Sequence, residues 1–339
     1  MKLLITGGCG FMGSNFIRYA AAAYPTYEIC NLDALTYAGN PENLRDMEHN
    51  ARYMFVHGRI EDEEAVEKIF KEFKPDAVIN YAAETHVDRS IMDPAAFLRT
   101  EVLGTYTLLE AVRRHGTARY IQISTDEVYG SIEHGTFSED APFLPNSPYS
   151  AAKAGGDHLC RAYWQTYHTP VIVTHSCNYY GPYHYPEKII PLFITNLLEE
   201  KNIPLYGDGT HVREWIYTED HCRAIDVLLH EGAIGEAYNI GTGYEIANID
   251  LAKNILALLG KNEKMIEPVL DRPGHDWRYA LNSSKLRSLG WKPRVSFDEG
   301  LSRTVEWFRT HEQWWKPLKS GTYLEYYHKQ YTARTSAER

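Results

Sequence analysis

The apolar residues of the first half of the chain form short runs that alternate with amphipathic stretches. Runs of strand length lie at residues 2–6, 28–32, 55–60, 76–81, 120–123 and 171–175. Stretches with helical spacing lie between them at residues 15–23, 63–73 and 97–115, and a further helix is predicted from Pro148. This alternation predicts an α/β fold of the Rossmann type, a doubly wound parallel sheet with helices on both faces.

The pattern changes after residue 175. Proline and aromatic residues become more frequent, the helical stretches shorten, and arginines stand singly in loops. Residues 238–240 nevertheless have the pattern of one more core strand. We therefore predict a first domain over residues 1–175 and a smaller, interleaved portion over 176–339, which returns to the sheet near residues 236–242.

Composition narrows the possible partners. The formal net charge of −10 argues against a nucleic-acid or anionic-membrane surface. The five cysteines are scattered, odd in number and without C-x-x-C spacing, which favours reduced thiols and no metal site. The apolar start of the chain runs straight into a strand, and no apolar run approaches the length of a membrane span. We expect a cytoplasmic protein.

Three glycines, Gly7, Gly10 and Gly13, lie between the first predicted strand and the first predicted helix. Such a triplet is a weak signal alone. Between a strand and a helix, however, it predicts a loop whose backbone comes close to a pyrophosphate bound at the helix N-terminus. Asp33 follows the second strand, where a carboxylate accepts a hydrogen bond from a ribose 2′-hydroxyl and repels a 2′-phosphate. This favours NAD over NADP, although Asp33 could also be an ordinary helix or turn cap.

A polar cluster follows the predicted strand at residues 120–123. Residues 124–127 would lie at the carboxyl end of that strand, where ligands bind in open α/β sheets. The helix from Pro148 places Tyr149 and Lys153 one turn apart. An ammonium beside a phenol lowers the phenol pKa, so Tyr149 is a candidate base. A lone pair at this spacing would more often be a solvated helix face, but here it follows an acidic cluster and a dinucleotide loop.

The sequence Ser-Thr-Asp-Glu-Val-Tyr-Gly at 124–130, followed by Tyr-x-x-x-Lys at 149–153, resembles the extended short-chain dehydrogenase/reductases. Within them the likeness is strongest to the dTDP-glucose 4,6-dehydratase family and extends to about residue 319. The resemblance implies NAD as cofactor and conversion of dTDP-glucose to dTDP-4-keto-6-deoxy-glucose, with a hydride passing from C4 to C6, for deoxysugar biosynthesis. The catalytic residues that it implies are Thr125, Asp126, Glu127, Tyr149 and Lys153.

The resemblance also assigns roles. Tyr149 with Thr125 would bind and deprotonate the sugar 4-hydroxyl, Glu127 would take the C5 proton, and Asp126 would protonate the departing 6-hydroxyl. Two adjacent carboxylates repel each other, which raises one pKa and keeps a proton on the acid.

Further binding residues follow from position and from the resemblance. Those expected around the cofactor are Gly7, Gly10, Phe11, Met12, Gly13, Asp33, Arg59, Ile60, Ala82, Ala83, Thr100, Ser124, Tyr149 and Lys153. Those expected around the nucleotide sugar are His86, Asp88, Asn178, Lys188, Pro204, Tyr206, Arg213, Asn248, Arg272 and His275. Arg213 and Arg272 are candidate pyrophosphate clamps because guanidinium forks match phosphate oxygens. Tyr206 could stack on a pyrimidine.

Two positions depart from the family pattern. Arg59 stands where relatives usually carry an aspartate near the adenine, so it would either stack on the adenine or point to solvent. Tyr179 stands where relatives often carry a second asparagine. Both departures leave the local contacts open.

Alternatives remain at this stage. A nucleotide-sugar 4-epimerase or decarboxylase of the same fold would share Tyr149 and Lys153 but would not need the Asp126–Glu127 pair. A non-catalytic dinucleotide-sensing protein would commonly lack the tyrosine or the lysine. The resemblance also implies a homodimer in which the helix near Tyr149 and the helix at 97–115 form a four-helix bundle with their mates.

Overall fold

A computed structural model describes residues 1–272 and 274–332 of the chain. Its largest element is a sheet of seven parallel strands in the order β10-β6-β5-β4-β1-β2-β3. The strands are β1 (Lys2–Thr6), β2 (Glu28–Asp33), β3 (Tyr53–His57), β4 (Ala77–Asn80), β5 (Arg119–Thr125), β6 (Val171–Ser176) and β10 (Ala237–Ile240). The predicted Rossmann-type doubly wound sheet is confirmed.

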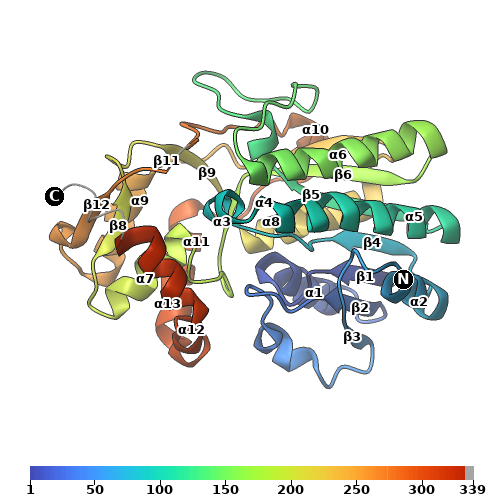
Figure 1. The fold of residues 1–339 in the computed structure, drawn as a ribbon, viewed down its shortest axis with the longest axis horizontal. Helices are drawn as coiled ribbons and strands as arrows, with labels where there is room; N and C mark the ends of the chain where they lie inside the picture. Colours follow the sequence, from blue (N-terminus) through green and yellow to red (C-terminus); the bar gives the residue numbers. More distant parts are fainter. Residues whose placement is uncertain (273, 333–339) are drawn as a thin grey trace.

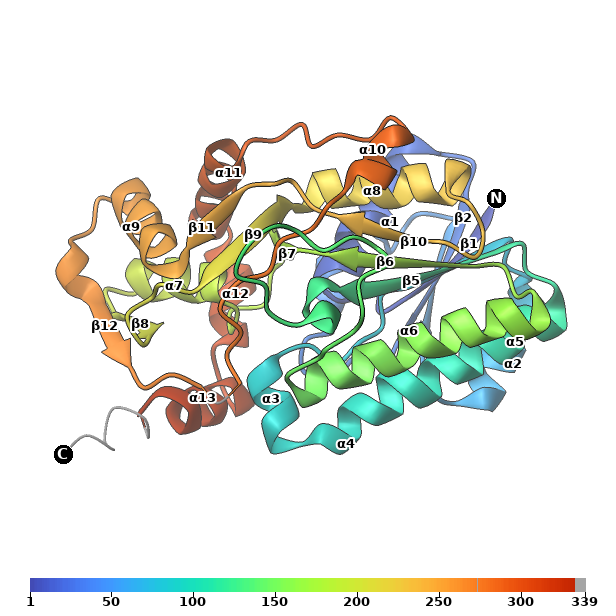
Figure 2. The ribbon, with the colours of Figure 1, turned by 90° about the horizontal axis from the view of Figure 1, so that it is seen from above.

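Helices cover both faces of this sheet (Figure 2). One face carries α2 (Glu63–Phe73), α5 (Thr105–His115) and α6 (Pro148–Tyr167). The other carries α1 (Phe11–Ala23) and α8 (Thr218–Glu231), with α10 (Ser284–Ser288) beside β10. Because both faces are covered, β1, β4 and β6 are buried almost continuously rather than at alternate residues.

Three predicted elements differ from those observed. Residues 97–115 do not form one α-helix, because α4 (Pro94–Phe97) continues into a π-helical segment, η2 (Leu98–Gly104), before α5 begins. Helix α1 begins at Phe11 rather than at residue 15, since Gly10 is its N-cap. Strand β3 ends at His57, so Arg59 and Ile60 lie in the loop that follows it.

The second part of the chain builds two smaller sheets, on the left of Figure 1. Strands β7 (Asn178–Tyr180), β9 (Val212–Tyr217) and β11 (Glu245–Ala247) form one, and β8 (Ile203–Tyr206) with β12 (Ile266–Val269) the other. Helices α7 (Ile189–Leu198), α9 (Asn248–Leu259) and α11 (Phe297–Thr310) pack on them around a separate apolar core.

Strand β10 belongs to the large sheet although it follows β7 to β9 in the chain. It pairs with β6 and places Asn239 next to Tyr129, whose hydroxyl donates to the Asn239 side chain at 3.0 Å. The second part is therefore interleaved with the first, while the division at residue 175 stays a prediction.

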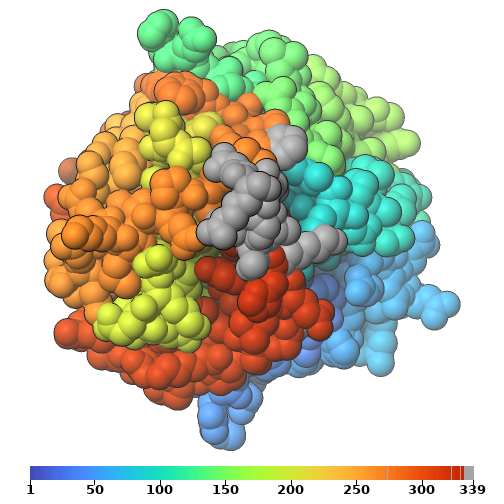
Figure 3. Space-filling model, turned by 60° about the vertical axis from the view of Figure 1, so that its left-hand side comes forward, coloured from blue at the N-terminus to red at the C-terminus, as the bar shows by residue number. Residues whose placement is uncertain are grey.

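The C-terminal helices lie between the two parts of the molecule. They are α12 (Glu312–Leu318), α13 (Thr322–Tyr327) and η5 (His328–Thr332), drawn in red beside both parts in Figure 3. Trp314 donates its indole N–H to the Asn43 side chain at 2.8 Å, which ties α12 to the first part. The remaining short helices are η1 (Pro41–Met47), α3 (Val87–Met92), η3 (Asp126–Tyr129) and η4 (Glu263–Met265).

Two further observations bear on the sequence expectations. All five cysteines are free and buried. Across the described ranges, no helix has the length and apolar character needed to span a bilayer. Residues 333–339, most of the chain after Tyr331, lie outside the described residues.

Candidate active site

The loop between β1 and α1 is shaped so that only glycine fits at key positions. Gly7 has φ +67°, and a Cβ there would lie 2.6 Å from the Ala82 backbone nitrogen. A Cβ on Gly13 would collide with the Gly7 carbonyl oxygen. Helix α1 has no acidic residue in its first turn and no side-chain cap at Gly10, so its positive N-terminus is open to an anion. This cradle fits the pyrophosphate of a dinucleotide.

Asp33 lies at the carboxyl end of β2, beside the cradle. Its side-chain oxygens accept hydrogen bonds from the backbone nitrogens of Cys9 at 2.8 Å and Leu35 at 2.7 Å. Burial raises the Asp33 pKa, and these hydrogen bonds oppose the rise. The carboxylate is therefore held in a fixed position at the end of β2, where sequence reasoning places the ribose acid.

Two cavities meet at Glu127. The first runs from the glycine loop across the carboxyl ends of β1, β4 and β5, and every residue expected to bind the cofactor lines it. The second lies between the two parts of the chain, and every residue expected to bind the nucleotide sugar lines it. Glu127, His86, Asn178 and Lys188 line both cavities. A ligand in one cavity would thus contact a ligand in the other beside the catalytic candidates.

Asp126 has the environment of a proton donor. Its carboxyl is 2% exposed and lies near Glu127 and Glu214. Burial and these two carboxylates raise its pKa well above the ordinary value. Its Oδ1 accepts a hydrogen bond from the Thr125 hydroxyl at 3.1 Å, and its Oδ2 has no partner within residues 1–272 and 274–332. The neutral acid is favoured at this position.

Glu127, the next residue, has a different environment. Burial raises its pKa, but the positive charges of Arg272, Arg213 and Lys188 oppose the rise. Two neighbouring carboxylates therefore differ in the balance of nearby charge: negative groups outweigh positive ones around Asp126, and positive groups outweigh negative ones around Glu127, although Arg213 acts on both. Such a pair suits one acid and one base.

The expectation for Tyr149 and Lys153 needs correction. Lys153 forms an ion pair with Glu101 at 3.0 Å and donates to the Ile123 carbonyl at 3.2 Å. The Tyr149 pKa is raised rather than lowered, because burial and the carboxylates of Glu127 and Glu101 disfavour the phenolate, although a hydrogen bond with Thr125 opposes them. The side chains alone therefore favour the neutral phenol.

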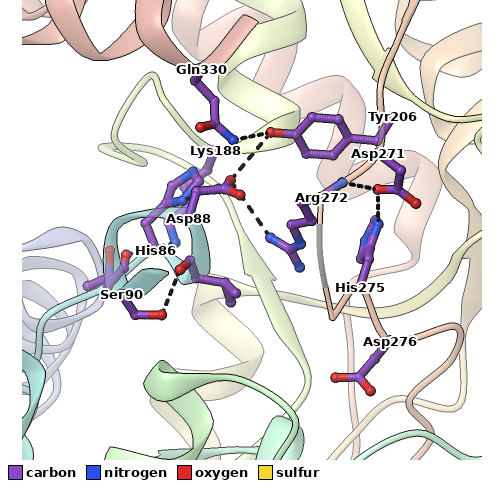
Figure 4. A network of polar contacts seen from close by, with 12 residues as sticks. His86, Asp88, Ser90, Lys188, Tyr206, Asp271, Arg272, His275, Asp276 and Gln330 are labelled. Carbon is purple, nitrogen blue, oxygen red and sulfur yellow. Dashed lines mark hydrogen bonds and ion pairs between the residues drawn. The ribbon is translucent and has the colours of Figure 1, made fainter. Parts of the chain in front are cut away.

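A polar network lines the nucleotide-sugar cavity (Figure 4). Asp88 Oδ2 accepts from the Tyr206 hydroxyl at 3.4 Å and lies 3.3 Å from His86 Nδ1 and 3.9 Å from Arg272 Nη1. His86 has φ +135°, which is rare for a residue with a side chain and is found where a site constrains the backbone. The network holds Tyr206 and Arg272 at the wall of the cavity.

The two arginines expected to clamp a pyrophosphate are placed differently. Arg213 donates to the backbone carbonyls of Val212 at 2.7 Å and Asp276 at 2.9 Å and stacks on Tyr279 at 4.6 Å, so much of its fork is already bonded. The Arg272 side chain is 14% exposed, and its Nε has no hydrogen-bond partner in the part of the chain that the structure describes. Arg272 is thus the better placed of the two to bind an anion.

The other expected residues lie as follows. Arg59 pairs with Glu61 at 3.2 Å with its side chain 56% exposed, and it also lines the cofactor cavity, so its contact with the adenine stays a prediction. Asn248 begins α9 with its Oδ1 buried and without a partner among the described residues. Lys188 donates to the Thr85 carbonyl at 3.3 Å.

One cluster has metal-ligand chemistry. Ligand atoms of His211, Asp271 and His275 all lie within 4.8 Å of one another. However, Asp271 already accepts from His275 at 2.7 Å and from the Arg272 backbone nitrogen at 2.7 Å. Burial and the guanidiniums of Arg272 and Arg213 lower the His275 pKa, and the same positive charge disfavours a cation here. We interpret the cluster as a support that orients His275.

Sequence reasoning missed two groups and left the contacts of a third, Tyr179, open. Glu101 is 1% exposed, and burial raises its pKa to about 7 despite its ion pair with Lys153. Arg89 and Glu187 form an ion pair at 2.9 Å, and Glu187 lines the second cavity. Tyr179 lines the cofactor cavity with its ring edge-to-face on His221 at 4.6 Å. Only the departure at Tyr179 was visible in the sequence.

A dinucleotide cradle beside a Tyr-x-x-x-Lys motif, with a second cavity next to it, defines an extended short-chain dehydrogenase/reductase. The GDP-mannose 4,6 dehydratase family profile matches residues 4–304. A dTDP-glucose 4,6-dehydratase from Streptomyces niveus is 48% identical and covers 94% of this chain and 96% of its own. The chain belongs to the dTDP-glucose 4,6-dehydratase family.

Solved structures agree. The dTDP-glucose 4,6-dehydratase DesIV from Streptomyces venezuelae, determined with NAD and TYD bound, has a TM-score of 0.92 and 49% identity and covers 94% of this chain and 100% of its own. A UDP-glucose 4-epimerase from Thermus thermophilus, in complex with NAD, has a TM-score of 0.86 and 32% identity over 92% and 100% of the two chains. The fold is thus shared with epimerases, and the sequence lies nearer to the dehydratases.

Proposed function

We propose that this protein removes water from dTDP-glucose to give dTDP-4-keto-6-deoxy-glucose. The observation that carries the proposal is the Asp126–Glu127 pair at the junction of the two cavities, with the pKa of the Asp126 carboxyl raised well above its ordinary value and Glu127 beside three cations. An epimerase has no use for such a pair, because it breaks no carbon–oxygen bond. The names of the relatives point to the same substrate.

The residues of the chain divide the chemistry between them. Tyr149 takes the proton of the sugar 4-hydroxyl. The resulting 4-ketone acidifies the C5 hydrogen, which Glu127 removes as a base, while Asp126 protonates the 6-hydroxyl as it leaves. Glu127 then returns its proton to C5.

NAD completes the site. The glycine loop, Asp33 and the residues that follow β4 and β5 would hold it. The glycines of the loop have no side chains, so the loop backbone can approach a pyrophosphate closely. When bound, NAD would supply the hydride transfer from C4 to C6, and its positive charge would favour the phenolate form of Tyr149. Lys153, which forms an ion pair with Glu101, is part of the wall of this cavity.

The nucleotide would lie in the second cavity. Arg272 offers a partly unbonded guanidinium for the pyrophosphate, and Asn248 offers a buried side-chain amide for a base edge. Tyr206 supplies an aromatic face in the same cavity.

A labelling experiment tests the proposed reaction. Substrate that carries deuterium at C4 should give product with deuterium at C6, and C5 should acquire deuterium from heavy water because Glu127 exchanges its proton. Mass spectrometry of the product gives both results. Label that returns to C4 would indicate an epimerase, and product without a C6 methyl would indicate a decarboxylase.

We further propose that the protein is a cytoplasmic homodimer. Large apolar side chains lie exposed on α3, η2 and α5, namely Ile91, Met92, Leu98, Leu103 and Tyr106. Helices with such residues on their surface are suited to a partner helix pair. Light scattering at micromolar concentration should give twice the chain mass of 38.9 kDa. A mass of one chain would contradict the dimer.

A further inference from the structure

The proton balance of the dehydration requires one transfer in addition to those described, if the proposed function holds. Oxidation at C4 gives a hydride to the cofactor and the O4 proton to Tyr149. Cleavage of the C6–O bond releases water, which takes a proton from Asp126. The C5 proton goes to Glu127 and returns to C5. Each turnover therefore leaves Tyr149 with one proton more and Asp126 with one proton fewer.

The Thr125 hydroxyl lies between these two groups. It donates a hydrogen bond to Asp126 Oδ1 at 3.1 Å, and it also acts on the Tyr149 phenol, whose phenolate form it stabilises. Its oxygen also accepts from the Glu127 backbone nitrogen at 3.3 Å. Thr125 therefore contacts both the group that gains a proton and the group that loses one.

These contacts give the chain of hydrogen bonds a direction. A hydroxyl has one hydrogen to donate and two lone pairs that accept. The Glu127 N–H occupies one lone pair of Thr125, and the hydroxyl hydrogen points to Asp126. In the state that the chemistry leaves, with a neutral Tyr149 phenol and an Asp126 carboxylate, the remaining lone pair accepts from the phenol, so Tyr149 donates to Thr125 and Thr125 donates to Asp126.

Solvent is a poor alternative source for this proton. Asp126 is 2% exposed and Thr125 is 8% exposed. A nucleotide sugar in the second cavity would cover the approach past Glu127, which lines both cavities. Asp126 would then be reached from the side of Thr125.

We propose that the Thr125 hydroxyl conducts a proton from Tyr149 to Asp126 once in every turnover. The phenol O–H bond of Tyr149 breaks as a new O–H bond forms on Thr125. The original Thr125 O–H bond breaks as the proton binds to the Asp126 carboxylate, and Thr125 ends neutral. The proton taken from O4 is thereby replaced on the acid that forms water at C6, and the sum is substrate to product plus water.

Variants at position 125 test the relay. Thr125→Val and Thr125→Ala remove the hydroxyl, and Thr125→Ser keeps it as the matched control. Asp126 begins protonated, so the first two variants should complete one turnover and then wait for a proton from solvent. Rapid quench with excess substrate should show a burst of one product per site. The later phase should be about 10²-fold slower than the burst, the low end of what a positioned proton-transfer group contributes.

The second measurement is the effect of a buffer on the rate of the slow phase. Imidazole, a small proton carrier, should speed the slow phase of Thr125→Val and Thr125→Ala but not the turnover of Thr125→Ser, which should show no burst. A linear time course from the first turnover in both hydroxyl-free variants, however slow, would overturn the relay and leave Thr125 a binding residue. If the parent protein forms no 4-keto-6-deoxy product, the proposed function itself fails, and this result is distinct from a missing burst.

Discussion

Replacing Glu127 with glutamine should stop dehydration and leave oxidation at C4 intact. Glutamine keeps the shape of the side chain but cannot take the C5 proton, so elimination loses its base. Product formation should fall by about 10²- to 10⁴-fold, the usual contribution of a positioned general base. Tyr149 does not depend on Glu127 to accept the O4 proton, so the near-ultraviolet absorbance of the reduced dinucleotide should build on adding substrate and persist.

Glu48→Gln makes the same replacement at an exposed residue. It is the matched control and should behave as the parent. Removing the Glu127 charge should also ease formation of the phenolate, since Glu127 is one of the groups that raise the Tyr149 pKa. A Glu127→Gln variant that turns over at the parent rate would mean that another group is the C5 base.

Arg89→Leu should lower the free energy of unfolding of the ligand-free protein by about 3–5 kcal/mol, the cost of leaving one member of a buried ion pair without its partner. The Glu187 side chain is 0% exposed and pairs with Arg89 at 2.9 Å. The Arg89 guanidinium also lies over the rings of Tyr37 at 3.7 Å and Tyr326 at 4.5 Å, so it joins the first part of the chain to α13. Urea unfolding measures the change.

Arg99→Leu removes an exposed arginine from the adjoining π-helical segment and should change stability by less than about 0.5 kcal/mol. The double variant Arg89→Leu with Glu187→Leu should recover part of the loss, because no unpaired charge is then left buried. Equal urea midpoints for Arg89→Leu and Arg99→Leu would show that the ion pair contributes nothing to the free energy of unfolding.

The sequence predicted those features that depend on neighbouring residues. The glycine loop is a local requirement of the backbone, because Gly7 needs a positive φ and Gly13 needs room. The Thr125–Glu127 triplet follows directly from the end of β5. Strand–helix alternation was enough to predict the parallel sheet, since strands buried on both faces are continuous apolar runs.

Features that join distant residues could not be predicted in this way. The partner of Lys153 is Glu101, which faces it only because residues 98–104 adopt a π-helix, and no spacing rule signals that. The raised pKa of Tyr149 follows from burial among carboxylates from different elements. Arg213 was expected to hold a phosphate, but its bonds to backbone carbonyls depend on where the loop at 276–277 folds back.

The return of β10 to the large sheet bears on how the protein is made. As the chain leaves the ribosome, β6 remains an unpaired sheet edge until β7 to α8 have been translated and β10 can pair with it. Tyr129, at the end of the catalytic segment, likewise gains its hydrogen bond to Asn239 only then. A nascent chain that stalls before residue 237 would expose an apolar edge and lack a supported catalytic turn, so activity begins only after most of the chain has been synthesised.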